Sequence, residues 1–228
     1  MGTKKKKEET TKLVSKILIV CVCVLFVGLM ILSGMGTSWL TIFTSVKAGD
    51  TVELDYTVYD SLGNPLLTSD QQIYNQRINS GYGIMFSKPL IVTANKSLAQ
   101  PLFPVQVYIS QSGGSKQFGF LRSEYDSISK AIIGMKSNEQ KKINLGTVNP
   151  ITEFLTNDQM KNLNLNFTMV DVGESIVLPI SETNRETPNS SPVQYLRIVQ
   201  IFNKTSEGVI LNYNLPSIDV RVVTINKQ

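Results

Sequence analysis

Apolar and polar residues alternate along residues 46–58, with Val52, Leu54 and Tyr56 on one face of the pattern and polar residues between them. This period of two predicts a strand with one buried face. A turn follows at residues 61–65, where glycine, asparagine and proline occur close together. The folded part of the chain is therefore predicted to begin with a strand that turns back on itself.

A short helix is predicted after a hairpin of two strands at residues 105–109 and 117–121. Ser123 and Asp126 form a capping-box pattern at the start of this helix, and Gly134 suits the left-handed residue at its end. The helix is predicted to bury one side, because the apolar residues at helical spacing are Tyr125, Ile128 and Ile132.

The remaining signals are mostly those of strands. Residues 80–118 are hard to assign as a whole and are predicted to be an excursion from the core, and a strand is predicted at residues 141–145. After Pro150 the chain becomes polar and rich in asparagine, and further strands are predicted at residues 170–180, 193–201, 208–213 and 218–225. Strands with a single helix predict an α+β fold in two small lobes.

The amino-terminal part has a different pattern. Residues 17–32 are almost purely apolar, and residues 33–43 extend this run, with Trp39 and Phe43 suited to a membrane interface. Lysines precede the run. The pattern predicts a transmembrane anchor at residues 17–43 and a basic cytoplasmic tail at residues 1–16. The protein is thus expected in the cell membrane as a single-pass protein, with the bulk of the chain outside the cytoplasm.

A cleaved signal peptide is the alternative, since Gly34 and Gly36 offer small residues for a cleavage site. Both interpretations export the rest of the chain. The Asn-x-Ser/Thr sequences are compatible with an exterior location, although chance would supply about as many; they begin at Asn95, Asn166, Asn189 and Asn203.

Composition excludes several classes of chemistry. The chain has no histidine, and its two cysteines, Cys21 and Cys23, lie within the apolar run. Nucleophilic catalysis that needs a histidine and zinc sites built from His or Cys are therefore excluded. The first 16 residues account for the whole net charge of +4, so the folded part is neutral and no nucleic-acid partner is expected. We expect no metal and no cofactor.

Three segments in this order resemble the FKBP family of peptidyl-prolyl isomerases. They are the first strand with its turn, residues 46–63; the block ISKAIIGMKSNEQKKI at residues 128–143; and the last strand, IDVRVVTI, at residues 218–225. The resemblance implies an antiparallel half-barrel sheet wrapped on one short helix.

The spacing of these segments is similar to that of the SlyD-like and long archaeal members of the family, which carry a chaperone domain inserted in the flap. By this resemblance, residues 44–149 and 213–228 form the FKBP-like domain, with the excursion at residues 80–118. Residues 150–212 form an inserted β-rich lobe.

Isomerisation of an X-Pro bond needs no nucleophile, because an apolar pocket that favours the twisted amide lowers the barrier. By the resemblance, the residues of this catalytic pocket are Tyr56, Leu66, Leu67, Tyr125, Ile128 and Ile218. The sequence departs from the family in two places. Leu67 replaces the pocket aspartate, and the Ala-Tyr-Gly motif expected after Leu145 is missing. An ordinary position in the hydrophobic core is the alternative for the pocket residues Tyr56, Leu66, Tyr125, Ile128 and Ile218.

Four further residues are candidates for substrate binding. Phe118 and Phe120 are expected at the rim of the pocket. Val177 and Leu178, followed by Ile180, are expected to offer an apolar strand edge to unfolded chains. An ordinary sandwich core is the alternative for this strand.

The resemblance implies a membrane-anchored isomerase and folding chaperone whose partners are proline-containing unfolded or exported polypeptides. Two alternatives remain open. One is a catalytically inactive FKBP-like chaperone or accessory subunit that binds other membrane or surface proteins. The other is a structural ectodomain with neither activity.

Overall fold

The computed structural model describes residues 2–34, 44–109, 114–147, 149–182 and 193–227. Within this described part the chain divides into two compact units, Met1–Thr44 and Ser45–Gln228. Each unit is considered by itself.

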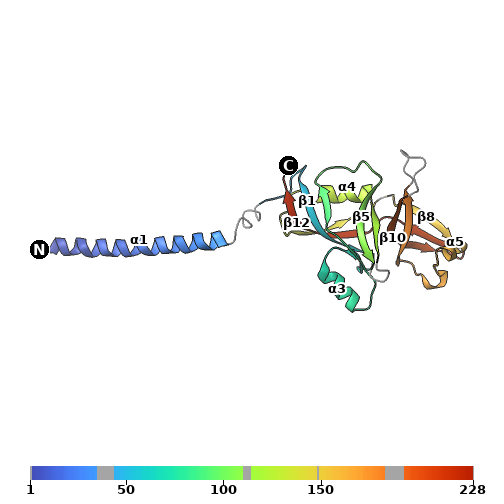
Figure 1. The fold of residues 1–228 in the computed structure, drawn as a ribbon, viewed down its shortest axis with the longest axis horizontal. Helices are drawn as coiled ribbons and strands as arrows, with labels where there is room; N and C mark the ends of the chain where they lie inside the picture. The colour runs from blue at the N-terminus through green and yellow to red at the C-terminus, as the bar shows by residue number, and fades with distance from the viewer. Residues whose placement is uncertain (1, 35–43, 110–113, 148, 183–192, 228) are drawn as a thin grey trace. The chain divides into compact units, whose positions relative to one another are not determined.

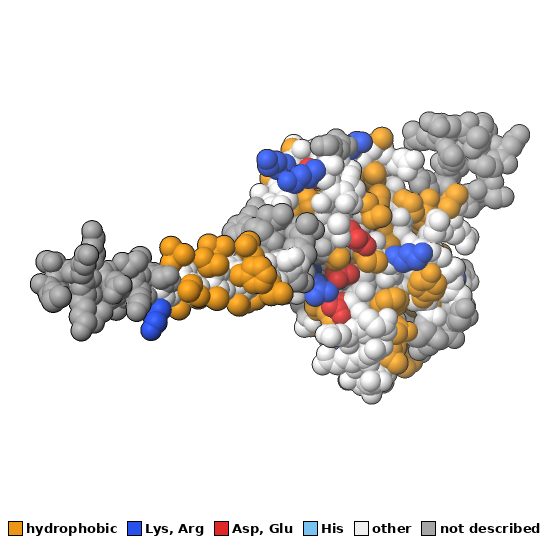
Figure 2. Space-filling model, turned by 60° about the vertical axis from the view of Figure 1, so that its left-hand side comes forward, with side chains coloured by type: hydrophobic (Ala, Val, Ile, Leu, Met, Phe, Trp, Pro, Cys, Tyr) orange, Lys and Arg blue, Asp and Glu red, His pale blue; other side chains and the backbone are white. Residues whose placement is uncertain are grey.

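The first unit contains the helix α1, Gly2–Gly34. Apolar side chains cover most of the part of its surface that Figure 2 shows in colour, and those of residues 17–27 are exposed. No described helix is both long enough and apolar enough to cross a membrane. Trp39 and Phe43, the predicted interfacial residues, lie outside the described residues, as does the sequence at Asn189.

The second unit has the predicted α+β class. Its described strands form a mixed sheet that curls into a half-barrel (Figure 1), in the order β7-β12-β1-β2-β3-β5-β6-β10-β11-β8. In addition, β4 pairs with β1 and β9 pairs with β10. The strands are β1 Thr51–Tyr59, β2 Pro65–Thr68, β3 Met85–Ser87, β4 Leu90–Thr93, β5 Leu102–Ile109, β6 Ser115–Leu121, β7 Gln140–Asn144, β8 Thr152–Thr156, β9 Ser175–Glu182, β10 Val193–Lys204, β11 Gly208–Asn212 and β12 Ser217–Asn226.

The predicted first and last strands are neighbours in this sheet. β1 and β12 pair antiparallel along their whole length, with Tyr56 opposite Val220 and Val58 opposite Ile218. The alternate residues of both strands face one hydrophobic core that also contains Ile128. A half-barrel is therefore confirmed, but the prediction of a purely antiparallel sheet was wrong, because β2 pairs parallel with β3 and β6 pairs parallel with β10.

The predicted helix exists as α4, Arg122–Ala131, but its predicted cap was wrong. Ser123 lies inside the helix and the N-cap is Leu121, whose backbone N–H donates to the Glu124 carboxylate at 3.0 Å. Glu124 therefore satisfies an amide group at the helix start that the serine does not reach. The left-handed exit at Gly134 is confirmed by its φ of +81°.

The excursion belongs to the same sheet. β5 and β6 form the predicted antiparallel hairpin, and β3 joins β5 to β2. Before β3 the chain forms a helix that the sequence pattern did not predict, α3, Gln71–Asn79, capped by the Asp70 carboxylate. Since α3 has no buried residue, it lacks the apolar face that a periodic pattern would reveal.

Residues 150–212 contain β8, β9, β10 and β11, together with α5, Asn157–Asn162, and the 3-10 helix η1, Phe167–Met169. These elements surround a second hydrophobic core. The strand predicted from residue 170 begins at Ser175 instead, because residues 171–173 form a turn in which Gly173 has a φ of +94°. The lobe boundaries remain a prediction, since both lie within the second unit.

Candidate functional site

The residues predicted for catalysis lie together but are buried. Tyr56, Ile128 and Ile218 are exposed by 1%, 0% and 0%, and Leu67 and Tyr125 are also buried in the same core. Leu66 differs from the other five, because it is only partly buried at the edge of this core. Five of the six predicted pocket residues therefore offer almost no surface to a ligand.

The two phenylalanines predicted at the pocket rim occupy the core instead. Phe118 and Phe120 are buried, and their rings pack edge to face with centroids 5.1 Å apart. Phe120 also packs edge to face on Tyr56, with ring centroids 5.7 Å apart. Both rings therefore belong to the hydrophobic core and do not form the rim of a pocket.

The hydroxyl of Tyr56 has no hydrogen-bond partner among the described residues. Burial raises the pKa of Tyr56 far above its ordinary value. The phenol is therefore neutral at physiological pH.

A buried ion pair next to these residues was not predicted. The Glu124 carboxylate in α4 accepts from the Arg197 guanidinium in β10, with Nη1 2.9 Å from Oε2, and neither side chain is exposed. Arg197 also donates to the carbonyl oxygens of Gly119 and Tyr213, and Glu124 accepts from the backbone N–H of Leu215. An arginine within the apolar run of residues 195–201 was the available sequence signal.

An apolar pocket lies where the lobe meets the rest of the sheet, and we call it the junction pocket. Its volume is about 270 Å³. It brings together two residues that the sequence analysis assigned to separate sites, Leu66 in β2 and Val177 in β9. The remaining lining residues are Gly83, Ile84, Met85, Ile109, Ser175, Ile176 and Ile198.

Hydrogen bonds beside the junction pocket join the turn after β1 to the lobe. The Ser61 hydroxyl donates to the carbonyl oxygen of Gly173 at 3.2 Å, and the Gln200 amide donates to Ser61. Gly173 in turn donates its N–H to the carbonyl oxygen of Ile201 at 2.8 Å. These bonds join the turn that precedes β2 to the turn that precedes β9.

A second apolar depression lies between β8 and β9, and we call it the edge groove. Its volume is about 570 Å³. Its lining residues are Ile151, Thr152, Glu153, Leu155, Leu163, Leu178, Pro179, Ile180, Ser181 and Tyr213. Val177 and Leu178 differ in exposure, because Val177 is exposed whereas Leu178 is largely buried in the lobe core. At one side of the groove the Tyr213 hydroxyl donates to Glu153, and burial followed by this contact raises the pKa of Tyr213.

No protein-family model matches the chain, and no curated protein matches it at a significant level.

Proposed function

We propose that this protein is an FKBP-like chaperone, anchored in the membrane by residues 17–43, that holds extended apolar segments of exported proteins. The observation that carries the proposal is the junction pocket, where Leu66 and Val177 line one apolar cavity of about 270 Å³. Cavities of this kind are the usual binding places for apolar groups. The apolar run of α1, preceded by lysines, supports the anchor.

The sheet order supports the FKBP-like part of the proposal. The three segments that carry the resemblance supply β1, the α4–β7 block and β12. In the structure β7, β12, β1 and β2 are consecutive in the sheet, and Ile128 of α4 belongs to the core that they share. The residues between β7 and β12 contain a second core, as an inserted lobe requires.

The burial of the predicted catalytic set argues for holding rather than catalysis. An isomerase must grip the proline ring in an apolar pocket and favour the twisted amide. Here Tyr56 packs on Phe120, and Leu67, Tyr125, Ile128 and Ile218 are buried in the same core. Isomerase activity remains a prediction that this arrangement disfavours, and the inactive chaperone is the function that the geometry supports better.

The two apolar depressions suit an extended polypeptide. The depressions follow each other along β9, because residues 175–177 line the junction pocket and residues 178–181 line the edge groove. A segment added alongside β9 would therefore pass the junction pocket first and the edge groove next, or the reverse. Pro179 has no backbone N–H, so we expect pairing to be strongest beside Ser175–Leu178.

The matched variants Val177→Asp and Val193→Asp test the proposal. Both valines are 46% exposed on strands of the lobe, but only Val177 lines the junction pocket. We expect the full chain, solubilised in mild detergent, to suppress aggregation of an unfolded client. Val177→Asp should lose most of this suppression, because a carboxylate in the pocket would be desolvated by the bound segment, and Val193→Asp should retain it.

A proline-limited refolding assay on the same samples separates the two functions. We expect no acceleration at micromolar protein. Acceleration that Tyr56→Ala abolishes would establish an isomerase and contradict the proposed lack of catalysis. Equal suppression of aggregation by both valine variants would refute the junction pocket as the holding site.

A further inference from the structure

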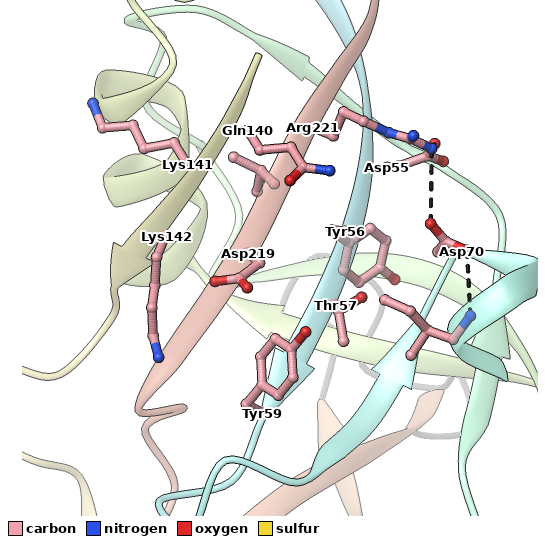
Figure 3. Close-up of a pocket in the computed structure, with 12 residues that line it drawn as sticks. Asp55, Tyr56, Thr57, Tyr59, Asp70, Gln140, Lys141, Lys142, Asp219 and Arg221 are labelled. Atoms are coloured by element: carbon pink, nitrogen blue, oxygen red, sulfur yellow. Dashed lines mark hydrogen bonds and ion pairs between the residues drawn. The ribbon is translucent and has the colours of Figure 1, made fainter. Parts of the chain in front are cut away.

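A third cavity lies on the outer face of the sheet, and we call it the outer pocket (Figure 3). Its volume is about 300 Å³. It is formed by residues of β1, β12, β7 and the start of α3. Its lining residues are Asp55, Tyr56, Thr57, Tyr59, Asp70, Ile73, Gln140, Lys141, Lys142, Asp219, Val220 and Arg221.

Most charged groups of the outer pocket already have partners. Arg221 donates to Asp55 at 2.7 Å, and its nearest contact with the Asp70 carboxylate is 3.8 Å. Asp70 also accepts from two backbone N–H groups at the start of α3. The Lys141 ammonium donates to the carbonyl oxygen of Ala131 at 2.8 Å. Asp219 and Lys142 are the two charged lining residues that take no part in these contacts.

Asp219 has no cation partner in the described part of the chain, where no Lys or Arg nitrogen lies within 4.0 Å of its carboxylate. Its Oδ1 is buried and makes no hydrogen bond with any described residue. Lys142 is its register partner on β7, but no ion pair joins them, and the Lys142 ammonium lies 5.9 Å from the ring centroid of Tyr59. A partly buried carboxylate without a partner is unfavourable, and a cation next to it would relieve this cost.

The other walls of the outer pocket suit the carbon chain of such a cation. Ile73 supplies an apolar side chain and Tyr59 supplies an aromatic ring, whose face attracts cations. Burial, followed by the charge of Asp219, raises the pKa of Tyr59, so its ring remains a neutral phenol. Figure 3 shows Asp219 and Tyr59 projecting from neighbouring strands on the same side of the sheet.

We propose that the outer pocket binds a primary ammonium or guanidinium group on an aliphatic stem, with Asp219 as its counter-ion and the Tyr59 ring beside it. Lysine and arginine side chains of a polypeptide have this chemistry, and so do small free diamines. This inference is independent of the proposed chaperone function, because the pocket shares no lining residue with the junction pocket or the edge groove.

Calorimetric titration of the full chain in mild detergent tests the inference with four probes. N-acetyl-arginine amide and N-acetyl-lysine amide represent peptide side chains, and cadaverine represents a free diamine. N-acetyl-citrulline amide is the neutral control, since it has nearly the shape of the arginine probe. We expect at least one of the three cations to bind about tenfold more tightly than the citrulline probe, because the ureido group of the control can donate hydrogen bonds but carries no positive charge for Asp219. If the two amino-acid probes bind more tightly than cadaverine, the cation comes from a polypeptide side chain. If cadaverine binds more tightly, the cation is a free diamine.

Three substitutions locate the binding. Asp219→Asn should weaken binding of the cation about tenfold or more, whereas Asp158→Asn, an exposed carboxylate paired with Lys161 in α5, should leave it within twofold. Lys142→Met should leave binding equal or tighter, because it removes a competing positive charge. An unchanged unfolding midpoint shows that Asp219→Asn is folded. Equal binding of citrulline, an unchanged affinity in Asp219→Asn or weaker binding in Lys142→Met would overturn the inference.

Discussion

Glu124 and Arg197 form an ion pair that is completely enclosed by the protein, with neither side chain exposed. The pair joins the first turn of α4 to β10, two elements separated by more than sixty residues of chain. Because Glu124 also accepts from Leu215 N–H, the same carboxylate contacts the segment that leads back to β12. The lobe strand β10 is therefore attached to the core helix by polar contacts as well as by apolar packing.

Removing only one partner of this pair should be severe. We expect Arg197→Met to reduce the free energy of unfolding of the 45–228 unit by about 3–5 kcal/mol, because Glu124 would remain as a buried charge without a cation. The double variant Glu124→Gln/Arg197→Met should be more stable than Arg197→Met alone, since it removes that charge and keeps an acceptor for Leu215. Urea unfolding measures both, and a double variant less stable than the single variant would contradict this account.

Tyr56 should respond to substitution as a core residue does. Tyr56→Phe removes a hydroxyl that has no partner among the described residues, so stability should be unchanged or higher by up to about 1 kcal/mol. Tyr56→Ala should cost about 3–5 kcal/mol through the cavity it creates. Thermal or urea unfolding checks the contrast. A loss of several kcal/mol in Tyr56→Phe would show that the hydroxyl makes an important contact.

Alkaline pH should destabilise the protein partly through the same residue. Tyr56 has a folded-state pKa raised by burial, whereas the unfolded chain releases this proton near the ordinary value of about 10. Its contribution to stability is therefore complete below pH 10 and declines as pH rises above it, by up to about 1.4 kcal/mol per pH unit. Tyr213 acts in the same direction. Urea unfolding at several pH values measures this decline in the free energy of unfolding, which should be shallower above pH 10 in Tyr56→Phe than in the parent. An identical slope would mean that Tyr56 does not contribute.

Gly208 allows β11 to approach β8 closely. A Cβ atom at this position would lie 2.0 Å from the carbonyl oxygen of Leu155, a distance that backbone atoms cannot accept without moving. We expect Gly208→Ala to cost at least about 2 kcal/mol and to disturb the edge groove. Gly119→Ala is the control, because its nearest neighbours are side-chain atoms at 3.4 Å, and it should remain within about 1 kcal/mol of the parent. Similar stabilities for both variants would contradict the β8–β11 pairing.

The half-barrel could be predicted from sequence because its signals are local. β1, β12 and α4 each show a clear period, and Gly134 has the left-handed conformation that the end of the helix required. The helix α3 was missed, although Asp70 is a readable cap, because no residue of that helix is buried. Strand and helix periods report which side of an element is buried but not what covers it.

The same limit explains why the candidate site differs from the prediction. Tyr56 and Ile128 were expected to face a cleft, and their periodicity is equally consistent with the packing on Phe120 that the structure shows for Tyr56. The junction pocket depends on contact between Leu66 and residues more than one hundred positions later, which no local pattern specifies. Leu66 and Val177 were each singled out from sequence, but their proximity was not.

The central claim is that an unfolded client lies against the junction pocket, and photo-crosslinking from that pocket tests it most directly. A benzophenone amino acid would replace Val177 in one full-length variant and Val193 in another, since the two valines are equally exposed. The account predicts client adducts from position 177 well above those from position 193. Adducts of equal yield from both positions, or none from position 177 while aggregation is still suppressed, would contradict it.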